Sequence, residues 1–369
     1  MREFRVAVPE AEVEGLRVRL RATRWARQLP GEGWERGVPV EYLRWVVEQW
    51  IEFDWRVWEA RLNAYPQFVT RIDEQDIHFL HVRSPQPDAL PLVLTHGWPG
   101  SVAEFLPVLG PLTDPAAYGG DPRDAFHVVA PSVPGHGFSV PLESGWDHLR
   151  IAKGWAELMR QLGYDRYGAQ GGDTGSVVSP LLGATDPDHV IGVHINGGLA
   201  YPDVRPDDQL SSVERERLKA ADRLRAVGTG YADLQSTRPQ TVSAALSDSP
   251  VGQLAWILEK FWEWTDPAKA LPHNAVDLDH LLFDVSIYWF TNTSATSANL
   301  YYEGGDQHAR SDVPTGVAVF PTDPAMRQVL ERRHRVVHWS EFARGGHFAS
   351  LEVPDLLVDD IRRFFRLVR

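Results

Sequence analysis

The stretch "YGAQGGDTGSVVSPLLGA", residues 167–184, decides the fold because it predicts a strand, a tight turn and a helix in immediate succession. Small residues surround Asp173, so the turn can be sharp and can point one side chain out above a sheet, as in a nucleophile elbow. Two interpretations stay open from this motif alone: Asp173 caps the following helix, or Asp173 is a nucleophile. A phosphate-binding loop fits less well, because no lysine follows and the glycine spacing differs.

Short apolar runs separated by helical stretches continue this pattern on both sides of the motif. They predict strands at 77–82, 90–97, 126–135 and 190–197, with helices between them. Strands that alternate with helices form right-handed βαβ units and a largely parallel sheet. The sequence therefore predicts an α/β fold with helices on both faces of the sheet.

A helical block rich in aromatic residues interrupts this pattern from about residue 200 to residue 305. Strands are again predicted at 315–321 and 335–340, and a last amphipathic helix at 354–369. A helical insertion late in an α/β domain indicates a cap over the carboxyl edge of the sheet, where ligands bind in open α/β folds. We expect four segments: an N-terminal extension at 1–80, the core at 81–204 and 306–369, and the cap at 205–305.

The N-terminal segment, residues 1–80, is predicted to be rich in helix and holds six of the 14 tryptophans. Within residues 38–62 apolar side chains recur every three or four positions, which predicts one amphipathic helix that begins near Pro39. We expect its apolar face to pack against the rest of this chain, and a partner-binding face is the alternative. Apolar helices of this kind also permit a homodimer.

Composition excludes several classes of function. The chain has 369 residues and a net charge of −13, so an electrostatic grip on nucleic acid or on anionic membranes is not expected. It has no cysteine, which excludes disulfides, thiolate metal ligands and a cysteine nucleophile. No segment has the apolar length of a signal peptide or a membrane anchor, and no metal-binding motif is present. We expect a soluble cytoplasmic protein.

The segment "LTHGWPGS", residues 94–101, leaves a predicted strand at the place where a hydrolase of this fold offers a backbone N–H to a developing oxyanion. Pro99 has no N–H, so Trp98 would be the donor, and the N–H of Thr174 would be the second one. His96 has two interpretations: a turn histidine that bonds to backbone groups, or a residue that contacts substrate.

Two later residues complete a constellation with Asp173. His347 lies in the glycine-rich segment "ARGGHFASLE" after the last predicted strand, and Asp323 follows the strand before it in "VAVFPTDPAMRQ". Asp323 could orient the histidine ring and stabilise its charged form. The chain order Asp173, Asp323, His347 is that of nucleophile, acid and histidine in α/β-hydrolases.

From about residue 3 to residue 367 the chain resembles the epoxide hydrolase family related to the microsomal and juvenile hormone enzymes, N-terminal extension included. The segments that carry the resemblance are "HGWPGS", "PSVPGHGFS", "GGDTGS", "STRPQTVSAALSDSPVGQLAWILEKFWEWT", "YWFTNT", "VPTGVAVFPTD" and "RGGHFASLE". The resemblance implies an α/β-hydrolase fold and an enzyme that converts epoxides to vicinal diols with water and without a cofactor. It also implies the absence of the membrane anchor that precedes the extension in microsomal members.

The resemblance assigns roles residue by residue. It implies that Asp173 is the nucleophile, His347 the histidine and Asp323 the charge-relay acid, where mammalian microsomal members have glutamate. Two cap tyrosines fall on Tyr231 and Tyr301, although Tyr302 is adjacent and is the alternative to Tyr301. The expected substrate contacts are His96, Trp98, Tyr231 and Tyr301.

A carboxylate nucleophile fits this chemistry, because an epoxide carbon is saturated and must be opened by displacement, which leaves an ester for water to cleave. A haloalkane dehalogenase is the nearest alternative, but it needs a halide-binding tryptophan after the nucleophile, and here Thr174 follows Asp173. A non-catalytic binding module of the same fold is the second alternative. Aromatic residues of the cap are compatible with a bulky or aromatic epoxide, in detoxification or in natural-product biosynthesis.

Overall fold

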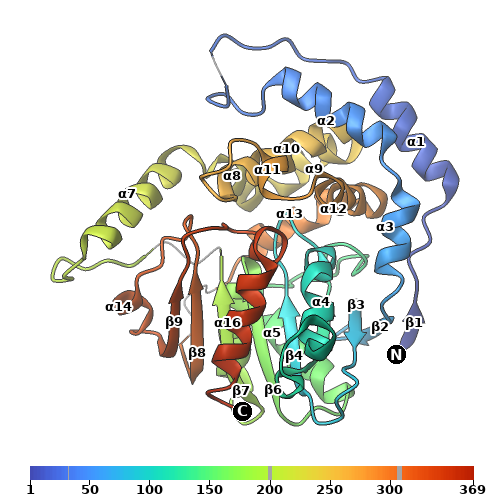
Figure 1. Ribbon diagram of the computed structural model, residues 1–369. Helices are drawn as coiled ribbons and strands as arrows, with labels where there is room; N and C mark the ends of the chain where they lie inside the picture. Colours follow the sequence, from blue (N-terminus) through green and yellow to red (C-terminus); the bar gives the residue numbers. More distant parts are fainter. Residues whose placement is uncertain (32, 198–201, 306–309) are drawn as a thin grey trace.

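One sheet organises the chain in the computed structural model, which describes residues 1–31, 33–197, 202–305 and 310–369. Over these residues the strand order is β1-β2-β3-β5-β4-β6-β7-β8-β9 (Figure 1). The strands from β5 to β9 in this order run parallel, as predicted. Their bounds are β4 (Leu90–Thr95), β5 (Phe126–Pro131), β6 (Tyr167–Gly172), β7 (Val190–Asn196), β8 (Ser311–Val319) and β9 (His334–Glu341).

The other edge of the sheet is antiparallel and comes from the N-terminal segment. It consists of β1 (Arg2–Phe4), β2 (Gln67–Ile72) and β3 (Gln75–Val82), and β3 pairs with β5. Asp73 and Glu74 join β2 to β3 with φ angles of 44° and 66°, the positive values that a two-residue hairpin of the primed type requires. The sequence predicted a strand at 77–82 only, because this hairpin turn contains neither glycine nor asparagine.

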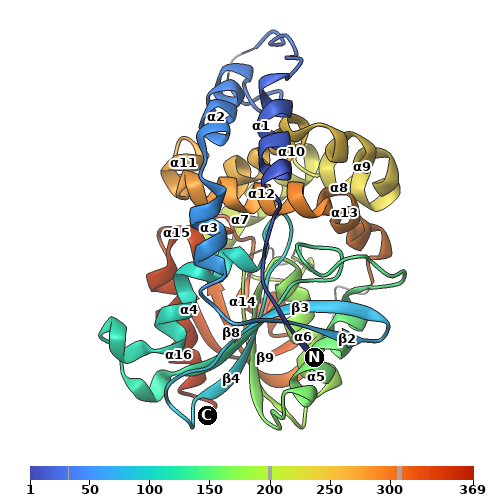
Figure 2. The same ribbon diagram turned by 90° about the vertical axis from the view of Figure 1, so that its right-hand side faces the viewer.

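Helices cover both faces of the parallel sheet (Figure 2). Helices α4 (Leu106–Thr113) and α16 (Pro354–Phe365) lie on one face, and α5 (His148–Gln161) and α6 (Thr174–Thr185) lie on the other. Two short helices, η1 (Val102–Phe105) and α15 (Ala349–Glu352), follow the loops that approach the carboxyl edge. The remaining short elements of the core are η2 (Pro115–Tyr118), η3 (Pro122–Asp124) and α14 (Arg327–Leu330).

A helical cap lies over the carboxyl edge of the sheet (Figure 1). It consists of α7 (Ser212–Val227), α8 (Gly230–Thr237), α9 (Pro239–Asp248), α10 (Pro250–Trp264), α11 (Pro272–Ala275), α12 (Leu278–Thr291) and α13 (Thr293–Glu303). Figure 1 shows α7 extending away from the other cap helices, and Ala221 is its buried residue.

The N-terminal segment holds α1 (Glu10–Arg21), α2 (Val40–Glu52) and α3 (Trp55–Leu62). The prediction of one helix over residues 38–62 is wrong, because Phe53 adopts an extended conformation and ends α2. Asp54 then caps α3, since its carboxylate accepts hydrogen bonds from the backbone N–H groups of Arg56 and Val57. Apolar periodicity continues across the break, so the sequence pattern could not reveal where α2 ends.

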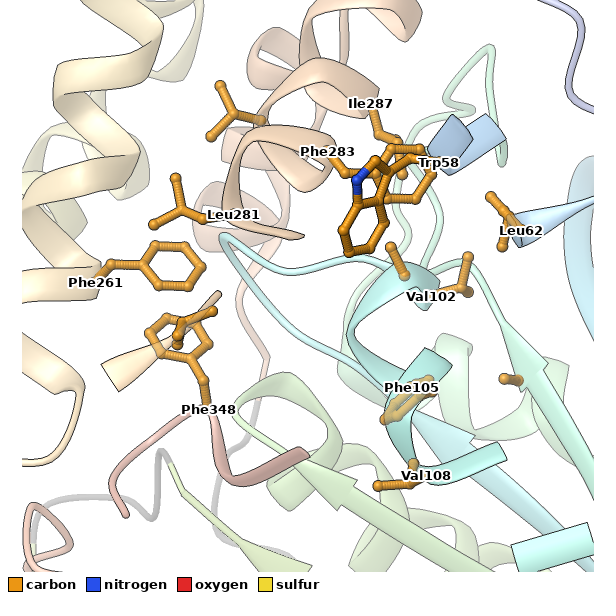
Figure 3. Packing of buried hydrophobic residues seen from close by; sticks show 14 of the residues in the cluster. Trp58, Leu62, Val102, Phe105, Val108, Phe261, Leu281, Phe283, Ile287 and Phe348 are labelled. Atoms are coloured by element: carbon orange, nitrogen blue, oxygen red, sulfur yellow. The ribbon is translucent and has the colours of Figure 1, made fainter. Parts of the chain in front are cut away.

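A shared apolar cluster joins the N-terminal helices to the cap and the core. Figure 3 shows Trp58 beside Phe283 of α12, with Val102 of η1 close to both. Farther along the cluster, Phe261 of α10 stacks on Phe348 with ring centroids 4.1 Å apart. The apolar face of the N-terminal helices is thus buried within this chain. In the described ranges no helix combines the length and the hydropathy needed to cross a bilayer.

Candidate active site

Asp173 occupies a sharp turn between β6 and α6. Its φ and ψ angles are 52° and −121°, a conformation that costs a non-glycine residue about 1–3 kcal/mol. The turn can close only because its neighbours lack side chains. A Cβ atom on Gly171 would lie 2.5 Å from the Cα of Gly175, and one on Gly175 would lie 2.1 Å from the carbonyl oxygen of Thr95.

The first carboxylate oxygen of Asp173, Oδ1, is held by two backbone donors. The N–H of Trp98 donates to it at 3.0 Å and the N–H of Thr174 at 2.7 Å. Because Thr174 is the first residue of α6, Asp173 also caps this helix. The two donors are the ones expected for an oxyanion hole, and the cap interpretation and the nucleophile interpretation describe the same geometry.

The second oxygen, Oδ2, faces His347, whose Nε2 lies 3.3 Å away. The backbone N–H of His347 donates to the carbonyl of Trp264, which fixes the loop against α10. Burial alone would raise the pKa of Asp173, but the hydrogen bond and charge of His347 outweigh it, and the pKa is lowered. Burial likewise opposes the charged form of His347, and Asp173 outweighs it and raises the pKa of the ring. Each group thus favours the charged form of the other.

Two further carboxyl groups act on the charge of His347. Asp323 is 3% exposed and its Oδ2 accepts the N–H of Phe320 at 2.8 Å. Burial raises the pKa of Asp323 to about 6, against the opposing effects of that N–H and of the charge on His347. Glu352 accepts the N–H of Phe348 at 3.0 Å, and burial raises the pKa of this carboxyl to about 7.

The two cap tyrosines gather around Trp98. The ring of Tyr231 stacks on Trp98 at 5.1 Å, and the ring of Tyr301 meets Trp98 edge-on at 6.0 Å. Burial raises the pKa of each phenol well above its usual value, with the charge of Asp173 adding to the effect, so both keep their protons near neutral pH. The adjacent Tyr302 is 60% exposed.

A cavity of about 600 Å³ opens between the core and the cap beside these groups. Its lining includes Asp173, His347, Tyr231 and Trp264. It is also lined by residues of α7 and of the loop after β8, namely Arg217, Ala220, Ala221, Leu224, Arg225, Pro321, Thr322, Asp323 and Pro324. Of the two tyrosines, Tyr231 lines the cavity and Tyr301 lies against Tyr231 and Trp98.

His96 has different neighbours from those expected of a substrate-binding residue. Its ring is fully buried, Nδ1 lies 3.1 Å from the carbonyl of Gly97, and Nε2 accepts the N–H of Val133 at 3.1 Å. Burial lowers its pKa to about 4, so the ring is neutral and donates from Nδ1. His96 therefore fixes the turn that carries Trp98, which was the other interpretation of this residue.

Sequence reasoning missed two charged residues near the site. Lys260 of α10 is 2% exposed, lies 4.7 Å from the ring centroid of Tyr231, and pairs with Glu259 and Glu263. Glu104 of η1 lies beside the turn that carries Trp98. A lysine in the apolar run of a predicted helix was the available signal for the first, and the sequence offered no signal for the second.

Two known protein families match parts of this chain. Residues 1–105 match the family described as epoxide hydrolase N terminus, and residues 91–236 match the family described as alpha/beta hydrolase fold.

Relatives match over nearly the whole chain. A putative epoxide hydrolase of Stigmatella aurantiaca is 46% identical over 99% of this chain and 85% of its own length. Epoxide hydrolase 1 of Sus scrofa is 35% identical over 100% of this chain and 89% of its own. Among solved structures, the epoxide hydrolase of Aspergillus niger aligns with a TM-score of 0.88 and 34% identity, covering 100% of this chain and 96% of that one.

Proposed function

Because this chain belongs to the epoxide hydrolase family of the α/β-hydrolase fold, we propose that it opens an epoxide through a covalent ester on Asp173 and releases a vicinal diol. The substrates are a small-molecule epoxide and water. The observation that carries the proposal is the unequal environment of the two Asp173 oxygens, since Oδ1 is held by backbone N–H groups while Oδ2 faces His347.

In the first step Oδ2 of Asp173 attacks an epoxide carbon from the side opposite to the C–O bond that breaks. The lowered pKa of Asp173 keeps the carboxylate ionised for this attack. Tyr231 lines the cavity beside Asp173, and Tyr301 contacts Tyr231. A phenol proton passes to the epoxide oxygen as the bond breaks, which yields a hydroxyl group, a phenolate and the ester.

In the second step His347 takes a proton from water, and the water oxygen attacks the ester carbon Cγ of Asp173. Negative charge then develops on Oδ1, where the N–H groups of Trp98 and Thr174 already point, and one such donor is typically worth about 2.7–4 kcal/mol. The imidazolium returns the proton to the departing alkoxide. The proton of the regenerated carboxylic acid restores the tyrosine.

The charge balance of the site supports this order of steps. In the resting site Asp173 raises the pKa of His347, which favours the imidazolium and opposes its use as a base. Formation of the ester removes the charge of Asp173, so the pKa of His347 falls. A protonated ring then loses its proton to solvent, and the neutral ring can accept a proton from the attacking water. Asp323 and Glu352 retain their influence on the ring and stabilise the imidazolium once it forms.

A single turnover with styrene oxide in heavy-oxygen water tests the ester directly. The label should appear in the peptide that contains Asp173, and label found in the diol alone would exclude a covalent route. His347→Gln should trap the ester as a mass increase of one substrate molecule on the intact protein. The same variant without substrate is the control.

The size and aromatic character of the epoxide are the subject of a separate proposal. The volume of the cavity and its lining by Tyr231, Trp264 and Leu224 support a bulky or aromatic epoxide. Comparing kcat/KM for epoxyalkanes and aryl epoxides of increasing size tests this preference. The cytoplasmic location and the homodimer expected from the sequence stay predictions, which cell fractionation and analytical ultracentrifugation would test.

A further inference from the structure

A second, much smaller cavity of about 20 Å³ lies against the candidate nucleophile. Asp173 and His347 line both this cavity and the large one, and the other lining residues of the two cavities differ. A water molecule needs about 10–15 Å³ of such space and two to four polar partners. The cavity therefore has room for one water beside both groups that act in ester hydrolysis.

Glu104 supplies a carboxyl group to the wall of this small cavity. Gly100 makes room for it, because a Cβ atom at that position would lie 2.3 Å from Oε2 of Glu104. Within the described parts of the chain no protein group forms a hydrogen bond with this carboxyl. Buried polar groups are normally hydrogen-bonded to protein or to ordered water, so a carboxyl in this position is suited to bind water.

Two other polar groups in the wall of the small cavity are already engaged with protein partners. Gln170 donates from Nε2 to Oδ1 of Asn196 at 2.7 Å. Oδ1 of Asp173 accepts two backbone N–H groups, as described above. Besides Asp173 itself, Glu104 and His347 are the ionisable side chains in the lining of this cavity, and both can hold a water against the ester carbon.

We propose that the small cavity holds the water that hydrolyses the ester, and that Glu104 is a further catalytic residue that fixes this water for proton transfer to His347. The inference rests on the ester mechanism proposed above. One O–H of the water donates to the Glu104 carboxyl and the other donates to Nε2 of His347. The water oxygen forms the bond to Cγ of Asp173, its proton goes to His347, and the bond from Cγ to the alkyl oxygen breaks.

The pKa of Glu104 changes during the cycle in the direction that the proposal requires. Burial raises the pKa of Glu104 well above its usual value, and the charges of Asp284 and Asp173 raise it further. Ester formation removes the charge of Asp173, so the pKa of Glu104 falls at the stage when water must be held. A carboxylate is the stronger acceptor for a water proton.

This placement makes the two half-reactions separable. The large cavity, where alkylation occurs, is lined by other residues, and Glu104 is absent from its wall. In Glu104→Gln, hydrolysis of the ester should therefore slow by at least about 10-fold, while alkylation stays within about 3-fold of the wild type. The value of kcat and the value of KM should fall together, with kcat/KM nearly unchanged, because the ester accumulates.

Rapid-quench kinetics with styrene oxide and intact-mass detection of the ester measure both steps. The exposed Glu48→Gln on α2 is the matched control and should behave as the wild type. A merely structural role would lower kcat/KM and the melting temperature, and would overturn the proposal. Glu104→Asp, which keeps the carboxyl, should recover part of the hydrolysis rate.

His347→Gln separates the two proposals. If this variant traps the ester but Glu104→Gln hydrolyses its ester at the wild-type rate, the water site is wrong and the covalent mechanism stands. If His347→Gln forms no ester, the covalent mechanism fails and the inference about Glu104 fails with it.

Discussion

Gly97→Ala should disable the enzyme by adding one methyl group. The new Cβ would lie 2.1 Å from Oδ1, 2.4 Å from Cβ and 2.5 Å from Cγ of Asp173, far inside van der Waals contact. The φ angle of Gly97 lies outside the left-handed region, so alanine meets no backbone strain there. The carboxylate must therefore move by roughly 1 Å, and a displacement of that size costs about 100-fold in rate. Movement of Oδ1 also weakens its bond from Trp98, which adds to the loss.

The assay is kcat/KM for diol formation, with the rate of ester formation measured by rapid quench and the melting temperature measured on the same samples. We expect kcat/KM to fall at least about 100-fold, with ester formation as the slowed step. Gly15→Ala in α1 is the matched control, because an added Cβ there meets nothing within 4 Å, and the helix should gain about 0.5–1 kcal/mol. A Gly97→Ala enzyme that retains activity within 3-fold of the wild type (~0.6 kcal/mol) would refute the assigned geometry of the nucleophile.

Three more predictions follow from the same structure. Tyr301→Phe should slow ester formation by roughly 10–100-fold, whereas Tyr302→Phe should not, since Tyr302 is 60% exposed; equal losses in rapid-quench assays would mean that the second proton donor is misassigned. Lys260→Met should lower the free energy of unfolding in urea by about 2–3 kcal/mol, because Glu259 and Glu263 lose their cation, and the exposed Lys269→Met should change it little. Burial alone would raise the pKa of Asp360, but hydrogen bonds from His194 and His338 outweigh this effect and lower the pKa. The Asp360 carboxylate therefore stabilises the fold above about pH 4, and this stabilisation is lost at lower pH. The free energy of unfolding of the wild type should therefore approach that of Asp360→Asn as the pH falls below the pKa of an unfolded aspartate (~3.9). A difference in urea denaturation that stays constant with pH would contradict this account.

The parallel half of the fold could be predicted because its strands are buried runs with helical patterns between them. The strands at 126–131 and 190–196 are continuous apolar segments of this kind. Of the antiparallel edge only the strand at 77–82 could be predicted, because β1 has three residues and pairs with β2, which lies more than 60 residues away in the chain. The break at Phe53 also depends on packing, since both α2 and α3 present apolar faces to the same cluster.

The candidate site was predictable where a motif fixes the backbone and not where tertiary packing places a side chain. Trp98 and Thr174 were identified because an elbow and a turn after a strand have defined N–H positions. His96 was assigned to substrate, and only the fold reveals that Val133 occupies its ring nitrogen. Glu104 gave no signal of its own, because the space it occupies depends on the absence of a side chain at Gly100.

The motif around Asp173 left a helix cap and a nucleophile as alternatives, and the structure explains why local sequence could not separate them. A cap needs a carboxylate that accepts an N–H of the first helical turn, and an oxyanion hole needs the same N–H aimed at the same oxygen. The difference lies in groups that are distant in sequence. Trp98 adds a second donor to Oδ1, and His347 leaves Oδ2 facing a cavity with two neutral phenols nearby. A cap that serves stability alone has no use for a strained φ angle at the capping residue, and this strain is what turns Oδ2 toward the cavity.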